Sequence, residues 1–182
     1  MRSFSILILA TTLAACQAPS AEATAQTQSI ETCFEPNDDC IALAVRQIDA
    51  ATSEVLVQAA GFTNNRIVRA LVQAEGRGVS VRMIIDDSRE NNAKIRAVAE
   101  SGAEVLSDDK VTSQHNKIMI FDRRHVLTGS QNFTRASETH AENMLIIHDQ
   151  PTVDAYVANW ERRGGASRPY VSRVGEENLT ED

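Results

Sequence analysis

The stretch HNKIMIFD, residues 115–122, decides how the chain is expected to fold. Ile118 to Phe121 is an apolar run rich in residues that favour β-structure, and it predicts a buried strand. Side chains alternate between the two faces of a strand, so His115 and Lys117 are expected to point the same way, about 6 to 7 Å apart at their Cα atoms. An imidazole and an ammonium group beside a buried strand are costly unless both have partners or a function.

The residues that follow predict a β-hairpin. Residues 122–124 are expected to form the connection, although two arginines are unusual in the primed turns that hairpins favour, and residues 125–128 should run back antiparallel. Continuing this register places Gly129 or Ser130 beside Lys117, and Asn132 beside His115. The hairpin thus gathers an imidazole, a fixed cation, a hydroxyl and an amide, which indicates a phosphate-binding site with a reactive group.

Working outward, the fold class predicted for the whole domain is α/β. Strands are expected at 29–34, 54–60, 79–85 and 103–106, and helices at 40–51, after Asn64-Asn65, at 91–101 and at 151–163. Alternation of strands and helices up to residue 106 predicts a parallel core, and the consecutive strands from His115 onward make the sheet mixed. We therefore expect a mixed, largely parallel sheet flanked by helices on both faces.

Two short motifs in this region have alternative interpretations. Gly76 and Gly78 are expected to end a helix and form a turn, because they precede a strand and so do not fit a phosphate-binding glycine loop. Asp86-Asp87 is expected to cap the helix that follows, and the alternative is a pair of metal-binding carboxylates.

The amino terminus predicts export. Arg2 precedes an apolar stretch, residues 4–13, that is too short to span a bilayer as a helix, so residues 1–15 are predicted to be a signal peptide. Leu13-Ala14-Ala15-Cys16 resembles the bacterial lipobox, which implies a lipidated Cys16 and, with Gln17 next, an outer-membrane lipoprotein on the periplasmic side. The alternative is cleavage near residues 21–25, which would leave a soluble periplasmic protein.

The remaining boundaries follow from composition. Residues 16–29 are small and polar and predict a flexible tether, residues 30–172 the folded domain, and residues 173–182 an acidic tail. Cys33 and Cys40 flank a Pro-Asn-Asp turn, and export makes a disulfide between them available. A metal pair is the alternative interpretation, but the sequence nearby offers no further His or Cys.

The spacing of the hairpin residues resembles a family signature. The pattern His-x-Lys-x4-Asp-x6-Gly-Ser-x-Asn, the HKD motif of the phospholipase D superfamily, is matched by His115, Lys117, Asp122, Gly129, Ser130 and Asn132. Residues 55–63, 76–86 and 141–148 also resemble segments of its small, single-motif bacterial endonucleases. The resemblance covers residues 30–172 and implies a metal-independent phosphodiesterase without a cofactor. Larger members carry the motif twice, so a single motif implies a homodimer that shares one site.

The resemblance also implies roles for the residues. His115 would attack the phosphorus and form a phosphohistidine, while His115 of a second subunit protonates the leaving oxygen. Lys117 and Asn132 would hold the non-bridging oxygens, and Ser130 would add a hydrogen bond. Glu142, at the head of the next strand, is predicted to accept a hydrogen bond from the imidazole.

Other polar residues are expected to be structural or peripheral. Asp122 belongs to the signature, but alternation places it on the opposite face from Lys117, so we expect an ion pair with Arg123 or Arg124 in place of direct chemistry. His125 and His148 are expected at the surface and His140 in a loop. Ser130 lacks the Gly-x-Ser-x-Gly context of a hydrolase nucleophile.

The substrate is less constrained than the chemistry. The chain has 182 residues, 42% of them hydrophobic, and a net charge of −7, which disfavours nucleic-acid binding unless a local basic face exists. The arginines expected to supply such a rim are Arg66, Arg69, Arg77, Arg123 and Arg124, although the first two also fit a solvated helix face. DNA or RNA is the expected substrate.

Two rival functions remain open. A phospholipase D or phosphatidyltransferase acting on envelope lipids is plausible for a membrane-tethered chain, but the sequence has no amphipathic stripe to admit acyl chains. A non-catalytic nucleic-acid-binding module is the third interpretation, and the intact motif argues against it.

Overall fold

Strands and helices alternate along the first part of the chain, and strands then follow strands. This computed structural model describes residues 30–90 and 92–172. The strands are β1 (Ile30–Glu35), β2 (Glu54–Ala59), β3 (Ser80–Asp86), β4 (Glu104–Asp108), β5 (Lys117–Phe121), β6 (His125–Gly129), β7 (Glu142–Ile147) and β8 (Arg168–Pro169). The helices are α1 (Cys40–Ala50), α2 (Asn65–Gly76), α3 (Ala93–Glu100) and α4 (Gln150–Ala166), with short 3-10 helices η1 (Asp87–Arg89) and η2 (Ala136–Thr139).

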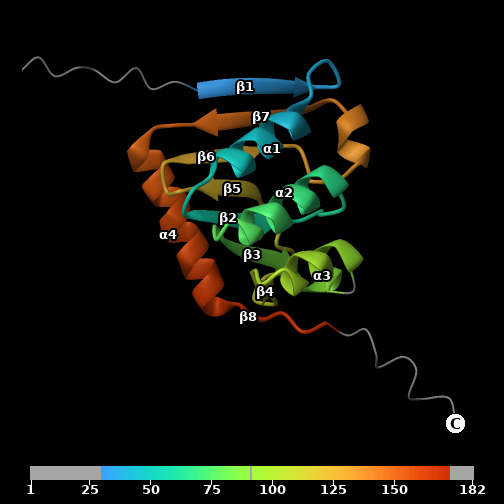
Figure 1. The fold of residues 1–182 in the computed structure, drawn as a ribbon, viewed down its shortest axis with the longest axis vertical. Helices are drawn as coiled ribbons and strands as arrows, with labels where there is room; N and C mark the ends of the chain where they lie inside the picture. Colours follow the sequence, from blue (N-terminus) through green and yellow to red (C-terminus); the bar gives the residue numbers. More distant parts are fainter. Residues whose placement is uncertain (1–29, 91, 173–182) are drawn as a thin grey trace, which may run out of the picture.

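The strands form one sheet in the order β1-β7-β6-β5-β2-β3-β4-β8 (Figure 1). The sheet is mixed, as predicted, but the prediction that it is largely parallel is wrong. Parallel pairing is confined to β2 with β3 and β3 with β4, and the other neighbours are antiparallel. The reason is that β5 and β6 are joined by a tight turn, which only antiparallel strands allow, and that β5 and β7 join the sheet without an α-helical crossover before them.

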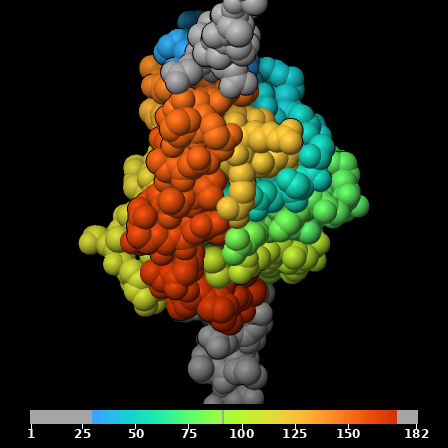
Figure 2. Space-filling model, turned by 90° about the vertical axis from the view of Figure 1, so that its left-hand side faces the viewer, coloured from blue at the N-terminus to red at the C-terminus, as the bar shows by residue number. Residues whose placement is uncertain are grey.

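Helices cover both faces of the sheet, as predicted. On one face, Val57, Met83 and Met119 belong to a core cluster with Ile41 of α1 and Leu71 of α2. On the other face, the side chains of α4 meet those of the central strands, with Val153, Val157 and Trp160 against Leu56, Ile84 and Ile120. Figure 2 shows α4 running along one side of the molecule, in orange and red.

The hairpin has the register that the sequence predicts. Ile118 lies opposite Thr128 and Phe121 opposite His125, so the next step of the same register sets Gly129 beside Lys117. The turn is of the primed kind, with positive φ at both Asp122 (51°) and Arg123 (54°). Two residues that are not glycine thus have a left-handed backbone conformation, which is stable only where the surrounding structure holds it.

Local capping follows the sequence closely, with one exception. Asp39 caps α1 and Asn64 caps α2, each by accepting a hydrogen bond from a first-turn amide. Gly78, at φ +84°, donates to the carbonyl of Glu75, which confirms the helix-end interpretation of the glycines. The prediction that Asp86-Asp87 caps the following helix is wrong, because Asp86 caps only η1 and α3 is capped by Asn92.

The predicted disulfide is present and joins Cys33 of β1 to Cys40 at the start of α1. Within the described ranges, no helix is both long and apolar enough to span a membrane. The predicted signal peptide, the lipidation site at Cys16, the tether at 16–29 and the tail at 173–182 lie outside the described residues.

Candidate functional site

A pocket of about 310 Å³ opens at the carboxyl ends of β2 and β3. Its lining residues come from four separate segments: Ala60, Gly61, Phe62, Thr63, Asp86, Ser88, Arg89, Asn92, Ser113, His115, Asn132 and Thr134. His115 and Asn132 therefore share one cavity, as the expected register requires. Such clefts beyond the carboxyl ends of strands are the usual ligand sites of open α/β sheets.

His115 and Lys117 form a close pair beside the pocket. The Lys117 Nζ lies 2.9 Å from the His115 Nδ1 and donates to the His115 carbonyl oxygen at 2.8 Å. His115 is exposed, whereas only 8% of Lys117 is exposed. Burial lowers the pKa of the Lys117 ammonium group, and the charge of Glu142 acts in the opposite direction, leaving the pKa below its ordinary value. The pair places a cation directly against the imidazole.

The segment that carries His115 is held by Asp86, a residue whose part in the site the sequence did not reveal. His115 precedes β5, and its backbone is irregular. The Asp86 Oδ2 accepts hydrogen bonds from the Ser113 hydroxyl at 3.0 Å and the Gln114 amide at 2.7 Å, and its Oδ1 accepts from Ser88. Burial acts to raise the pKa of Asp86, but these hydrogen bonds outweigh it and lower the pKa.

This set of donors also bears on the metal interpretation of Asp86-Asp87. Both carboxylate oxygens of Asp86 already accept hydrogen bonds from the protein. Across residues 30–90 and 92–172, no three His, Cys, Asp or Glu side chains are grouped as metal ligands. The only signal in the sequence for the role of Asp86 is its position at the end of a buried strand.

Asn132 reaches the pocket because the chain crosses over after β6. Phe133 forms a single parallel bridge with Phe62, and its amide donates to the Gly61 carbonyl at 3.1 Å. A Cβ on Gly61 would lie 3.2 Å from the Asn132 Oδ1 and 2.9 Å from the Thr134 Cγ2. Glycine at position 61 therefore permits the close approach that seats Asn132 opposite the end of β2.

Ser130 and Glu142 pair with each other beside the site. The Ser130 hydroxyl donates to the Glu142 carboxylate and accepts from the Asn143 amide at 3.1 Å. The hydrogen bonds of the described residues place the His115 ring against Lys117, and they include none between Glu142 and His115. The orienting role of Glu142 stays a prediction.

Asp122 lies at the other end of β5. Its carboxylate accepts hydrogen bonds from the amides of Thr52, Ser53 and Glu54 and from the Thr52 and Ser53 hydroxyls. Burial acts to raise the pKa of Asp122, but the hydrogen bonds from Glu54, Thr52 and Ser53 outweigh it, so the pKa lies well below its ordinary value. The predicted ion pair with Arg123 or Arg124 is wrong, because the neighbouring backbone amides satisfy the carboxylate first. Asp122 anchors the start of β2.

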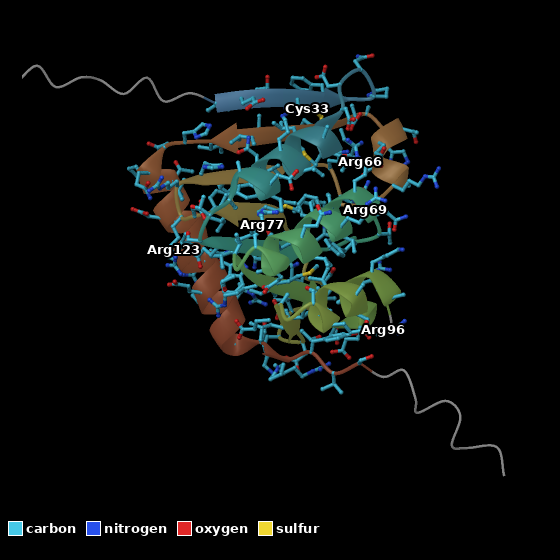
Figure 3. The ribbon with its side chains drawn as sticks, in the orientation of Figure 1. Cys33, Arg66, Arg69, Arg77, Arg96 and Arg123 are labelled. Atoms are coloured by element: carbon cyan, nitrogen blue, oxygen red, sulfur yellow. A yellow bond between two sulfur atoms is a disulfide. The ribbon has the colours of Figure 1, made fainter. Side chains whose placement is uncertain are left out.

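The expected basic rim is not assembled. Figure 3 shows Arg66 and Arg69 at one end of the sheet and Arg123 at the other. Arg66 pairs with Asp39 through both terminal nitrogens, and Arg123 pairs with Glu54 and Glu161. The cation that lines the pocket is Arg89, which the sequence interpretation missed.

The other three histidines lie outside the pocket. His125 is half-buried, contrary to the surface position predicted, since its ring stacks on Phe121 and its Nε2 lies 2.9 Å from the Gln47 Oε1. Burial, followed by the nearby His148, lowers the pKa of His125. His140 and His148 are exposed, as predicted.

Comparison with known proteins is consistent with this geometry. The family model described as "Cardiolipin synthase, PLD-like domain" matches residues 44–163. A protein named phospholipase D from Rickettsia conorii is 36% identical over 137 residues, which cover 74% of this chain and 68% of that protein. The mitochondrial cardiolipin hydrolase of Xenopus tropicalis is 35% identical over 104 residues, covering 56% of this chain and 50% of its own length.

Two solved structures also resemble this chain. Nuc from Salmonella typhimurium, described as a phospholipase D family member, matches with a TM-score of 0.74 and 33% identity over 79% of this chain and 99% of its own. NucT from Helicobacter pylori matches with a TM-score of 0.70 at 20% identity, over 78% of this chain and 99% of its own, which is a likeness of fold.

Proposed function

This chain belongs to the phospholipase D superfamily of phosphodiesterases, and we propose that it is a metal-independent endonuclease that cleaves DNA or RNA. The observation that carries the proposal is the pocket in which His115 and Asn132 meet, with the Lys117 Nζ 2.9 Å from the imidazole. Nine of the twelve lining residues have polar side chains, and Phe62 is the one large apolar side chain. A lining of this kind suits a sugar-phosphate chain better than acyl chains.

The reaction proceeds in two displacements. The His115 Nε2 attacks the phosphorus, a P–N bond forms, and the P–O bond to the leaving oxygen breaks as a general acid protonates that oxygen. Water then attacks the phosphorus, the P–N bond breaks, and the general acid, now a base, takes the proton of the water. Lys117 and Asn132 stabilise the negative charge on the non-bridging oxygens in both steps.

The general acid is assigned to His115 of a second copy of this chain. Within one copy, His115 is the only histidine among the described residues that lines the pocket. Attack through Nε2 also requires that Nδ1 keep its proton and donate it to an acceptor, whereas a lysine ammonium is a donor. In the active form the His115 Nδ1 must therefore donate its hydrogen bond to a carboxylate instead of lying against Lys117. We propose that this carboxylate is Glu142.

The decisive experiment is a parallel assay of single-stranded DNA, RNA and phosphatidylcholine vesicles in excess EDTA. The protein should cut the nucleic acids, and His115→Ala should lower the rate on the order of 10⁴-fold or more, as expected for the loss of a nucleophile. His148→Ala is the matched control, and it should retain activity because His148 is exposed and lies outside the pocket lining. Activity that disappears on chelation would contradict the metal-independent mechanism.

The second candidate is a phospholipase. It is favoured by relatives that are named phospholipase D and mitochondrial cardiolipin hydrolase. Faster turnover of vesicle phosphatidylcholine than of DNA in the same assay would replace our proposal with this one. Binding of nucleic acid without turnover would instead indicate the non-catalytic module.

We further propose that the protein works in the bacterial periplasm as a lipoprotein anchored through Cys16. The Cys33–Cys40 disulfide supports an oxidising compartment, since such bonds are rare in reducing ones. Cells fed labelled palmitate should label the protein, and Cys16→Ser should abolish the label. A labelled Cys16→Ser protein would rule the anchor out.

A further inference from the structure

A second hollow adjoins the pocket of His115. It has a volume of about 420 Å³ and is lined by Thr63, Ser88, Arg89, Asn92, Ala93 and Lys94. Thr63, Ser88, Arg89 and Asn92 also line the first pocket, so the two hollows share a wall. A molecule bound at His115 can extend past Arg89 to Lys94 without leaving the protein surface.

The two cations of this wall differ from most others in the protein. Nine arginines and lysines form ion pairs: Arg46, Arg66, Arg77, Arg82, Arg96, Lys110, Arg123, Arg163 and Arg168. Arg89 and Lys94 make no ion pair with any residue that the structure describes. Two cations without an acidic partner on one wall leave their positive charge available to an anion beside the pocket.

The wall itself is fixed by Asn92. Its Nδ2 donates to the Phe62 carbonyl at 2.8 Å, and its Oδ1 accepts from the Lys94 amide at 2.8 Å. One side chain thus joins the segment after β2 to the first turn of α3. Because both ends are bonded, the backbone that carries Lys94 has a set position relative to the pocket.

From this geometry we infer that Arg89 and Lys94 form a second phosphate subsite, which binds a phosphate next to the scissile one in a nucleic-acid strand. The inference rests on the proposed nuclease function and deepens it, because it assigns the residues that recognise a substrate with repeated phosphates. A positively charged groove that follows the backbone is the general device of proteins that bind single strands without reading their sequence.

The first test compares two substrates, the dinucleotide TpT with one phosphodiester and the tetranucleotide TpTpTpT with three. The wild-type kcat/KM should be about tenfold or more higher for the longer substrate, as one charge-assisted phosphate contact allows. Arg89→Gln and Lys94→Gln should each reduce this ratio, and the double variant should bring it close to three, the ratio of cleavable phosphodiesters in the two substrates. Arg162→Gln is the matched control, since Arg162 is exposed on α4 and bonds only Asn159 and its own helix.

The second test measures binding without cleavage. In the His115→Ala background, the affinity for a labelled oligothymidine is measured against salt concentration. Adding Arg89→Gln and Lys94→Gln should reduce the slope of log K against log salt by about 0.7, the value for one phosphate contact on a single strand.

The outcomes separate the two proposals. If the wild type cleaves lipid and not oligonucleotides, the nuclease proposal fails, while a change in the salt slope would still support the subsite. If the double variant loses kcat/KM equally on both substrates, or the slope does not change, the subsite is overturned. Equal loss from Arg162→Gln would overturn it too, because the effect would then be one of overall charge.

Discussion

The carboxylate of Asp86 accepts hydrogen bonds from two segments at once. Ser88 belongs to η1, and Ser113 and Gln114 belong to the segment that precedes β5. Asp86→Asn should replace one acceptor oxygen with a donor and loosen the backbone next to His115. We expect kcat to fall on the order of 10²-fold, the scale of a small misplacement of a reacting group, with a smaller change in KM. Steady-state kinetics on oligothymidine would measure both.

Asp87→Asn provides the control for Asp86. Its side chain is exposed and adjacent in sequence, and it changes the charge equally. A matching loss in both variants would mean that charge, and not the position of His115, explains the effect. An unchanged kcat in Asp86→Asn would dismiss its positioning role.

Asp122 makes a prediction about stability and pH. Its folded pKa is lowered, so its contribution is fully present above the ordinary carboxyl pKa and is lost as pH falls toward the folded value. Asp122→Asn should therefore lower the free energy of unfolding by about 2 kcal/mol at pH 7 and by much less near pH 2, well below the ordinary carboxyl pKa. Urea unfolding at both pH values measures this, with the exposed Asp49→Asn as control.

An equal loss of stability at pH 7 and pH 2 would contradict the assignment, because it would show that the charge of Asp122 is irrelevant. Activity should change little in folded Asp122→Asn. The carboxylate bonds residues at the beginning of β2, whereas the pocket opens beyond the end of that strand.

At the scale of elements, the approach of β6 to β7 depends on Gly129. A Cβ there would lie 2.2 Å from the Asn143 carbonyl oxygen, closer than any real contact. Gly129→Ala should cost about 2 kcal/mol or more, because the backbone of one strand must move. Gly165→Ala in α4 is the control, since its Cβ would meet nothing within 4 Å and alanine favours the helix.

Urea unfolding of both glycine variants decides the matter. A Gly129→Ala protein as stable as the wild type would show that the two strands tolerate a wider spacing, and the signature glycine would then need another explanation.

The same elements show what local sequence could predict. The hairpin register followed from the apolar run at residues 118–121 and the short connection after it, and the end of α2 followed from Gly76 and Gly78. These are short-range effects.

The predictions that were wrong concern contacts between residues far apart in the sequence. Antiparallel pairing of β2 with β5 joins residues far apart in the chain. So do the hydrogen bonds that the Thr52 amide donates to Asp122 and the Gln114 amide donates to Asp86. The missed Arg89 belongs to a short 3-10 turn without apolar periodicity, and Arg66 and Arg123, two of the five arginines grouped as a rim, pair with acids far away in the chain.

At the scale of the whole molecule, the single imidazole in each pocket predicts that activity belongs to pairs of chains. When a fixed amount of wild type is equilibrated with excess His115→Ala, activity per wild-type chain should fall steeply, because most wild-type chains then have an inactive partner. His148→Ala added in the same excess should cause no such fall. Activity per wild-type chain that stays constant against His115→Ala would mean that one chain suffices.

The direction of β1 fixes where the predicted tether would join the domain. Ile30 pairs with Ile147, whose other neighbour is Val126 beside the hairpin turn, while Glu35 pairs with Glu142 near the pocket. The chain therefore enters the domain at the edge remote from His115, separated from it by a strand about 20 Å long. A lipid on Cys16 would therefore be attached at the end of β1 far from the reactive cavity, and the flexible tether expected at 16–29 would leave that cavity open to dissolved polymers.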